Sequence, residues 1–434
     1  MDNDSARNTT RVTLGSLARV EGEGRLSFTV RDGRVEAAEL NIYEPPRFFE
    51  SFLRGRDFRE PPDITSRICG ICPVAYQVSA CNAIEQACDA DLDQPILDLR
   101  RLLYCGEWIA SHTLHIYLLH APDFLNVSDA VELARIARAD VERGLALKKA
   151  GNAILDLIGG RSIHPVNVRL GCFYRAPTLS ELGPLAEQLR TALDDALATL
   201  RWVSHFEFPD AEIDYDLLAL THTGQYPIEN GSLTTASGSI FAPSEFCDHV
   251  EERQVPHSTA LHAYLDGHAY LTGPLARYSL NSAELSDTAR QAATEAGLGA
   301  VCRNPFQSIV VRAVETVFAV DEALRLIREY QRPDQPYVDV SPHAATGYGV
   351  SEAPRGVLYH SYQLDPEGRI LRATIIPPTS QNQAAIEDDL RKTLAANLML
   401  TDTELAKLCE KTIRNYDPCI SCATHFLDLT IDRA

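Results

Sequence analysis

The spacing of apolar positions changes along the chain, and it predicts strands near both ends with helices between them. Apolar and polar residues alternate over Arg25–Val30 and Val35–Ile42, on either side of Asp32-Gly33, a dipeptide typical of hairpin turns. Residues 95–205 and Ile309–Glu329 instead repeat their apolar positions at helical spacing. Alternation therefore predicts sheet, the longer period predicts helices, and together they predict an α+β protein.

Several boundaries follow from the same periodicity. Ser128–Leu157 is expected to form one continuous helix, and Leu179–Trp202 another. Residues 205–260 are expected to be loop-rich. Strands return up to Ile376, and a single helix is expected over Ala384–Cys409.

These elements predict one domain over residues 1–434, with a mostly helical bundle core and small sheets near the N-terminus and before the C-terminal helix. No internal repeat or low-complexity tract divides the chain. Its expected parts are a β-rich part (11–60), a helical core (61–335), a β-rich segment (336–382), a C-terminal helix with a cysteine motif (383–425) and a tail (426–434).

Composition narrows the possible partners. The net charge of −20 argues against binding to nucleic acid or to an anionic membrane surface. No run of about 20 apolar residues exists, so no membrane span is predicted. The polar, acidic start of the sequence does not resemble a signal peptide, and the 11 cysteines favour a reducing compartment. We therefore expect a cytoplasmic location.

Two C-x-x-C motifs lie at opposite ends of the chain, one with Cys69 and Cys72 and the other with Cys419 and Cys422. Each pair can hold one metal, and four thiolates select a soft transition metal. The spacing alone leaves two readings open, namely a buried four-thiolate metal site or unrelated core and redox cysteines. The first reading requires the two termini to meet at the metal.

The residues around these cysteines resemble the two signature motifs of the nickel–iron hydrogenase large subunit. R-I-C-G-I-C-P and D-P-C-I-S-C-A-T-H stand in the right order at the right ends, and intermediate segments match over most of the chain. Within this family, the sequence resembles the soluble, NAD(P)-linked group of hydrogenases. The resemblance implies reversible cleavage of H2, with Cys69 and Cys419 as terminal nickel ligands. Cys72 and Cys422 would bridge nickel to an iron that carries carbon monoxide and cyanide.

The resemblance also assigns the groups around the metals. Glu21, in R-V-E-G, matches a glutamate that relays protons, and Asp123 matches an aspartate in the canopy over the open metal position. Arg355, in E-A-P-R-G, would hang its guanidinium over the metals and assist the thiolate of Cys419 as a base. Asp417 would complete the canopy.

Further ligands follow in the same way. Pro378 and Thr379 match a turn that contacts a cyanide ligand. Glu50 and His425 match two magnesium ligands, and the Ile375 carbonyl is a further candidate, since Mg²⁺ prefers oxygen ligands. In the family a maturation protease cuts after the position of His425.

Two segments refine the expected surroundings of the metals. Tyr76 stands where the family often has a histidine beside a bridging sulfur, and its hydroxyl is expected to take that place. The helical run that holds His112, His115 and His120 resembles a segment that orients metal ligands.

No further cluster motif or phosphate-binding glycine loop is present, so no iron–sulfur cluster or flavin is expected on this chain. Electrons would leave through a small subunit that holds an iron–sulfur cluster. Further expected partners are subunits that bind flavin and NAD(P).

Three other functions compete with this one. An electron-transfer subunit of the respiratory complex I type shares the fold, but such relatives have lost the four thiolates that this chain keeps. A hydrogen-sensing protein can retain all four. A deazaflavin- or heterodisulfide-linked hydrogenase differs only in its electron acceptor, which lies on other chains.

Overall fold

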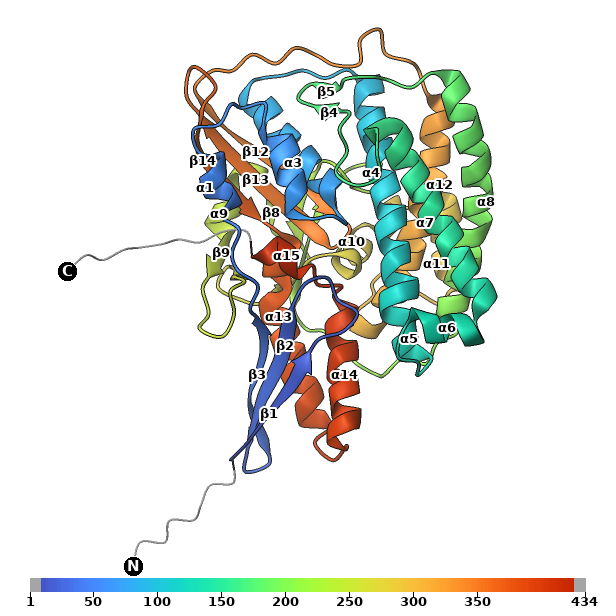
Figure 1. Ribbon diagram of the computed structural model, residues 1–434, viewed down its shortest axis with the longest axis vertical. Helices are drawn as coiled ribbons and strands as arrows, with labels where there is room; N and C mark the ends of the chain where they lie inside the picture. The colour runs from blue at the N-terminus through green and yellow to red at the C-terminus, as the bar shows by residue number, and fades with distance from the viewer. Residues whose placement is uncertain (1–8, 425–434) are drawn as a thin grey trace, which may run out of the picture.

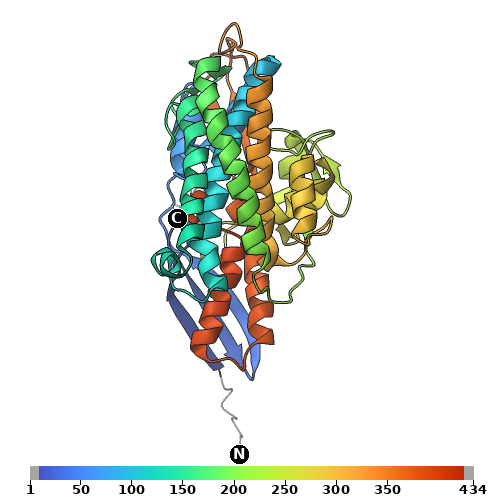
Figure 2. The same cartoon turned by 90° about the vertical axis from the view of Figure 1, so that its right-hand side faces the viewer.

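A bundle of four long helices forms one side of the molecule. The computed structural model describes residues 9–424, with side chains from residue 15 onward. The bundle contains α4 (Gln94–Leu114), α7 (Arg138–Gly159), α8 (Leu179–Ser204) and α12 (Ser308–Glu329), which lie side by side in both views (Figures 1 and 2). This arrangement confirms the mostly helical core that the apolar periodicity predicts.

Glycines allow two of these helices to approach closely. A Cβ atom on Gly151 of α7 would lie 2.8 Å from the backbone nitrogen of Ala110 in α4. One on Gly106 of α4 would lie 2.9 Å from Ile154 Cβ. Any larger residue at these positions would push α4 and α7 apart.

The N-terminal sheet is antiparallel, in the order β1 (Thr9–Ser16), β2 (Gly24–Arg31), β3 (Arg34–Ile42). Asp32 and Gly33 both adopt positive φ, 49° and 73°, as the tight turn between β2 and β3 requires. The predicted hairpin is therefore confirmed. Helix α13 (Pro378–Ala396) packs against β3.

A second antiparallel sheet contains β12 (Ala345–Ala353), β13 (Gly356–Leu364) and β14 (Ile370–Ile376), which confirms the strands predicted before Ile376. Helix α3 (Pro73–Ala87) packs across this sheet (Figure 1). The contact is close, because a Cβ atom on Gly349 would lie 2.3 Å from the Ser79 carbonyl oxygen.

Residues 205–260 are mostly loops, as predicted, but they also contain short strands that the sequence did not reveal. Four strands form a mixed sheet in the order β11-β6-β7-β8, and β9 pairs with β10. Most of these strands have only two to four residues, too few for period-two alternation to be recognised. Their bounds are β6 Asp216–Thr221, β7 Ser232–Thr235, β8 Ile240–Phe241, β9 Val250–Arg253, β10 His262–Leu265 and β11 Tyr270–Leu271.

Two predicted helices are each divided. The run Ser128–Leu157 breaks at Ala137, whose φ and ψ of −137° and 52° are not helical, so α6 (Ala130–Ile136) precedes α7. The run Ala384–Cys409 is also two helices, since α13 ends at Ala396 and α14 covers Asp402–Asn415. A capping box between Thr401 and Glu404 starts α14.

The remaining elements are short. They are α1 Phe49–Leu53, α2 Pro61–Thr65, a π-helix His115–His120, α5 Ala121–Phe124, β4 Val168–Arg169, β5 Cys172–Phe173, α9 Phe246–His249, α10 Pro274–Asn281, α11 Asp287–Glu295, α15 Ile420–Ala423 and 3₁₀ turns at Ser66–Ile68, Pro243–Glu245, Ser282–Glu284 and Pro305–Gln307. Within residues 9–424, no helix is long and apolar enough to cross a membrane.

Segments from near the two ends of the chain meet beside α15. The Ile420 amide donates a 3.0 Å hydrogen bond to the Glu21 carbonyl, which joins the connection between β1 and β2 to the second cysteine motif. Gly22, at φ 88°, is needed here, because a Cβ atom would lie 2.6 Å from Ile420 Cβ. The predicted meeting of the ends at a buried site is therefore observed.

Candidate metal centre

Four thiols converge where α3 and α15 begin. Cys72 is the residue before α3, Cys69 lies in the preceding turn, and Cys419 and Cys422 come from α15 and its N-terminal boundary. The Sγ atoms of Cys69 and Cys419 are 3.3 Å apart, and those of Cys72 and Cys422 are 3.8 Å apart. All four lie within 4.8 Å of one another and are buried. This donor set fits a soft transition metal.

Burial and mutual contact set the charge of these thiols. Hydrogen bonds from Cys419, Cys422 and Cys72 lower the pKa of Cys69, whereas burial raises the pKa of Cys419. The cluster therefore favours one shared thiolate in the absence of metal. A bound cation would ionise the others.

Arg355 lies beside the thiols on the segment between β12 and β13. Its Nε donates a 2.7 Å hydrogen bond to the Asp417 carbonyl, and its Nη2 is 3.1 Å from Asp417 Oδ2. Burial opposes its charge, but Asp417 and the cysteine thiols raise its pKa above the usual value. The buried Nη1 has no hydrogen-bond partner within the described chain, so a donor remains for a ligand.

Glu21 contacts the thiol cluster directly. Cys419 Sγ donates a 3.1 Å hydrogen bond to Glu21 Oε2, and the same oxygen accepts from the Ser421 amide at 3.0 Å. The predicted relay residue is therefore within proton-transfer distance of a thiol.

Thr379 fixes the backbone of the second cysteine motif. Its Oγ1 accepts a 3.1 Å hydrogen bond from the Cys419 amide, and Pro378 precedes it as the first residue of α13. Both predicted positions thus lie at the start of a helix that points at the cluster.

Glu50 and Ile375 also meet, although they are far apart in the sequence. The Ile375 amide donates a 2.6 Å hydrogen bond to Glu50 Oε1, which joins α1 to the end of β14. The third predicted magnesium ligand, His425, lies outside the described residues.

Asp123 has different neighbours from those expected. Its Oδ1 accepts hydrogen bonds from Arg19 at 2.5 Å and Arg414 at 2.7 Å, not from Arg355. Together with these arginines it lines a surface groove. The backbone connects Arg414 to the site, because the Arg414 carbonyl accepts a hydrogen bond from the Asp417 amide. Asp123 therefore joins Arg19 to Arg414, and its place in the canopy over the metals stays a prediction.

Two of the three histidines in the preceding helical run bind other side chains or backbone. His112 Nε2 lies 2.9 Å from Glu315 Oε2, and His115 Nε2 lies 2.8 Å from the Arg414 carbonyl oxygen. Tyr76 is completely buried, and the pKa of its hydroxyl is raised first by burial and then by Cys422 and Cys72. The hydroxyl has no hydrogen-bond partner among the described residues, so its substitution for the histidine of the family stays a prediction.

Three residues that the sequence did not single out help to build the site. Glu44 Oε2 accepts a 3.1 Å hydrogen bond from Ser421 Oγ. Arg47 contacts both cysteine motifs, through the carbonyls of Ile68 and Ser421. Glu107 accepts from the first two free amides of α3, at Val74 and Ala75. Of these three residues, only Glu107 could have been noticed in the sequence, because it is a carboxylate within an apolar helical run.

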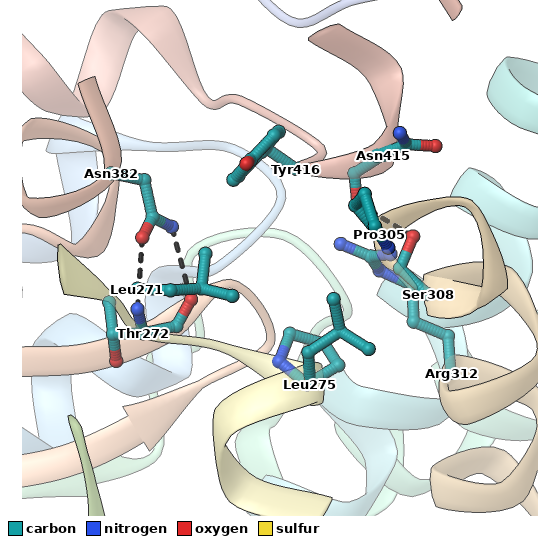
Figure 3. A pocket seen from close by; sticks show the side chains of 10 residues that line it. Leu271, Thr272, Leu275, Pro305, Ser308, Arg312, Asn382, Asn415 and Tyr416 are labelled. Carbon is teal, nitrogen blue, oxygen red and sulfur yellow. Dashed lines mark hydrogen bonds between the residues drawn. The ribbon is translucent and has the colours of Figure 1, made fainter. Parts of the chain in front are cut away.

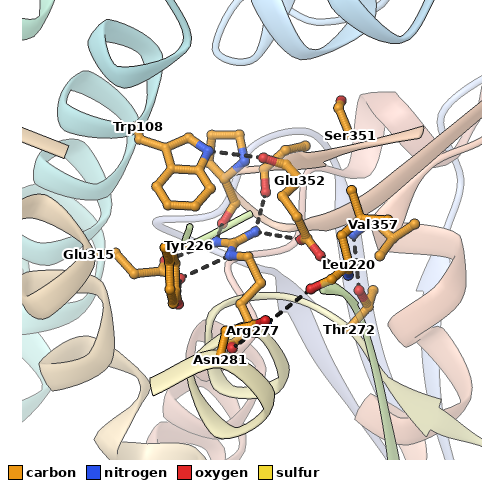
Figure 4. A network of polar contacts seen from close by, with 12 residues as sticks. Trp108, Leu220, Tyr226, Thr272, Arg277, Asn281, Glu315, Ser351, Glu352 and Val357 are labelled. Carbon is orange, nitrogen blue, oxygen red and sulfur yellow. Dashed lines mark hydrogen bonds and ion pairs between the residues drawn. The ribbon is translucent and has the colours of Figure 1, made fainter. Parts of the chain in front are cut away.

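A buried charge network supports the backbone of the Arg355 segment (Figure 4). Arg277 forms ion pairs with Glu315 at 2.8 Å and Glu352 at 2.9 Å. It also donates to the carbonyls of Ala353 and Pro354, the two residues before Arg355. Arg277 therefore positions the segment from which Arg355 reaches the thiols.

A small pocket lies beside the residues that precede Asp417 (Figure 3). Asn415 and Tyr416 line it together with Arg312 and the apolar side chains of Leu271 and Leu275. None of the four cysteines lines this pocket, so it is separate from the thiol cluster.

The fold and the four thiols under an arginine define a metalloenzyme component that handles a soft transition metal. Nickel-dependent hydrogenase is the family that matches, over residues 47–158 and 259–425. The chain belongs to this family, and it is the large, catalytic type of subunit, because that subunit carries the cysteine ligands.

The proteins to which this chain is similar are also named as hydrogenases. The alpha subunit of sulfhydrogenase 1 from Pyrococcus furiosus is 32% identical over 96% of this chain and 98% of its own length. The matching component of the F420-non-reducing hydrogenase vhu from Methanocaldococcus jannaschii is 30% identical over 88% of this chain and 98% of its own. An NAD⁺-reducing [NiFe]-hydrogenase structure aligns with a TM-score of 0.86 and 26% identity over 96% of this chain and 99% of that one.

We expect Cys422→Ser to abolish stoichiometric nickel binding, because a hydroxyl is a harder and far weaker ligand than a thiolate. The measurement is nickel and iron per chain in the purified protein. Cys247→Ser is the matched control, since Cys247 is exposed and outside the cluster. Equal nickel in both variants would contradict the assigned ligand set.

Proposed function

We propose that this hydrogenase component exchanges electrons with NAD(P) through a small subunit that contains an iron–sulfur cluster. The observation that carries the proposal is the similarity to the NAD⁺-reducing enzyme, which extends over nearly the whole of both chains. Relatives named as F420-non-reducing hydrogenase and coenzyme F420 hydrogenase make other acceptors the main competitors.

When bound, a nickel–iron pair supplies the Lewis acid and the electron acceptor that cleavage of H2 requires. The protein's part is to move the proton. A proton at Cys419 Sγ lies one hydrogen bond from Glu21 Oε2, and the Ser421 amide holds that carboxylate oxygen in place. We assign transfer from Cys419 to Glu21 as the first step by which the proton leaves the site.

Arg355 and the start of α13 are suited to hold small ligands on iron. The free Nη1 of Arg355 is a charged donor, and Thr379 keeps its hydroxyl hydrogen available while its oxygen accepts from Cys419. Carbon monoxide and cyanide fit this set, because cyanide accepts such hydrogen bonds. Asp417 keeps the guanidinium in place.

Glu50 is the proposed magnesium ligand of the described chain, with the Ile375 carbonyl and His425 as further ligands. Burial raises the pKa of Glu50 from 4.5 to about 7. In metal-free protein its contribution to stability is therefore present below pH 4.5 and lost as the pH rises through about 7. Mg²⁺ requires the ionised form.

We expect stabilisation by Mg²⁺ to be larger at about pH 8 than at about pH 6, because more of Glu50 is then ionised. Thermal unfolding with and without Mg²⁺ measures the difference. The Glu50→Gln variant should lose the stabilisation by Mg²⁺. The Glu36→Gln variant should keep it, because Glu36 is an exposed residue on β3. A Mg²⁺ effect that survives in Glu50→Gln would rule out this ligand.

The remaining partners belong to the same proposal. Flavin- and NAD(P)-binding subunits would complete electron transfer, and a maturation protease would remove the tail after His425. Among the described residues none of the 11 cysteines forms a disulfide, which suits the reducing cytoplasm.

The acceptor is tested with the intact complex under H2. We expect reduction of NAD⁺ or NADP⁺ at a rate comparable with that of an artificial dye, and little reduction of a deazaflavin. Dye reduction with no NAD(P) reduction would overturn the acceptor assignment alone. Infrared bands of carbon monoxide and cyanide in the same sample test the iron ligands separately.

A further inference from the structure

A second group of metal-ligand side chains lies away from the four cysteines. His257 is in the segment between β9 and β10, His262 is the first residue of β10, and Glu387 is on α13. One ligand atom from each lies within 4.8 Å of the other two. His257 Nε2 is 2.8 Å from Glu387 Oε1, and His262 Nδ1 is 3.9 Å from Glu387 Oε2.

His262 is the unusual member of this group. Its side chain is only 2% exposed, yet within the described residues its Nε2 has no hydrogen-bond partner. Its Nδ1 is too far from Glu387 for a hydrogen bond. Nδ1 is the nitrogen that faces Glu387, and coordination of a cation by Nδ1 would give this buried ring a polar partner that Glu387 alone does not provide.

The chemistry of the group suits a particular class of ion. Two imidazoles and one carboxylate are the donor set of zinc sites with three protein ligands and one open position. Burial lowers the pKa of His262 to about 4, so the ring is neutral and available as a ligand at pH 7. Side chains of His257 and Glu387 remain 21% and 17% exposed, which leaves an entry path for the ion.

We propose that His257, His262 and Glu387 form a second metal site, which binds one Zn²⁺ or a similar divalent transition-metal ion. This site is separate from the thiolate centre and does not depend on the proposed electron acceptor.

Bound metal would add a direct link between three elements that already pack against one another. The Leu40 amide on β3 donates a 2.8 Å hydrogen bond to Glu387 Oε1. Thr259, between the two histidines, donates from its amide to the Ile42 carbonyl at 2.9 Å. A metal at Glu387 would fasten the 254–261 segment to α13 and to the N-terminal sheet.

Helix α13 also connects this site to the thiolate centre. Thr379, which binds the Cys419 amide, lies eight residues before Glu387, or about 12 Å along the helix. The second metal would therefore stiffen the middle of the helix whose first turn contacts the second cysteine motif.

The experiment uses the purified complex after dialysis against a chelator. Zn²⁺ is added in competition with a chromophoric chelator, and zinc, nickel and iron are counted per chain. We expect one equivalent of zinc in addition to the nickel and iron. His257→Ala and Glu387→Gln should each weaken its binding at least about 100-fold, because they remove a direct ligand. The partly exposed position of His257 makes its variant the one that is safest for folding.

His249→Ala is the matched control. His249 also faces a carboxylate, Asp266 at 3.1 Å, but this pair is more exposed and has no third ligand among the described residues. Its variant should bind zinc as the unaltered chain does. X-ray absorption at the zinc edge should show nitrogen and oxygen neighbours at about 2.0–2.1 Å.

Three results would overturn the proposal. They are no stoichiometric zinc in the unaltered complex, equal zinc binding in His257→Ala, Glu387→Gln and the control, or sulfur neighbours in the absorption spectrum. Sulfur would place the zinc at the cysteines, and equal binding would leave His257 and Glu387 as a simple ion pair.

Discussion

In the Glu21→Gln variant we expect hydrogen oxidation to fall about 10²–10⁴-fold while nickel and iron contents stay unchanged. Glutamine keeps the shape and can still accept a hydrogen bond from the Ser421 amide, but it cannot take the proton from Cys419. Turnover with a dye and exchange of deuterium between D2 and water both measure the loss, since each requires the proton to leave the site.

Glu23→Gln is the control for this experiment. Glu23 is two residues away and shares the same turn, but it is joined to Glu44 through its backbone amide, which the substitution leaves in place. It should retain turnover within a few-fold. Normal exchange in Glu21→Gln would show that protons leave by another route, and loss of nickel would show that Glu21 is needed for the site to form.

The largest effect on stability is expected from Arg277→Leu. Removal of the guanidinium leaves Glu315 and Glu352 buried without their cation, and such unpaired buried charges cost about 3–5 kcal/mol. The carbonyls of Ala353 and Pro354 lose their donor as well. The midpoint of denaturant unfolding should therefore drop strongly, and turnover should decrease because Arg355 is less well positioned.

Arg325→Leu provides the comparison. Arg325 also pairs with two glutamates, Glu322 and Glu329, but its side chain is 41% exposed. Solvent screens such pairs, so we expect a change of about 1 kcal/mol or less. Similar losses in the two variants would mean that the Arg277 network contributes no more than a surface ion pair.

The ligands of the thiolate centre were predictable because their pattern is local. Each C-x-x-C places two thiols together, and the flanking residues distinguish the motif from chance cysteines. The hairpin turn at Asp32-Gly33 was predictable for the same reason, since two adjacent residues determine it.

Contacts across the fold could not be predicted in this way. Glu44 and Arg47 look like ordinary surface charges in the sequence, and their role depends on Ser421, which is more than 370 residues away. Asp123 is a related case. Its motif was recognised, but its partners are decided by the path of Arg19 and Arg414 around it.

The distance of 350 residues between the paired cysteines has a consequence for biosynthesis. At about 5–20 residues per second, a ribosome needs roughly 20–70 s to make the second motif after the first has emerged. Closing so long a loop also costs about 5 kcal/mol in chain entropy. Cys69 and Cys72 must therefore wait as reduced thiols until the second motif has been made, and full coordination of the metal cannot come before that point of synthesis.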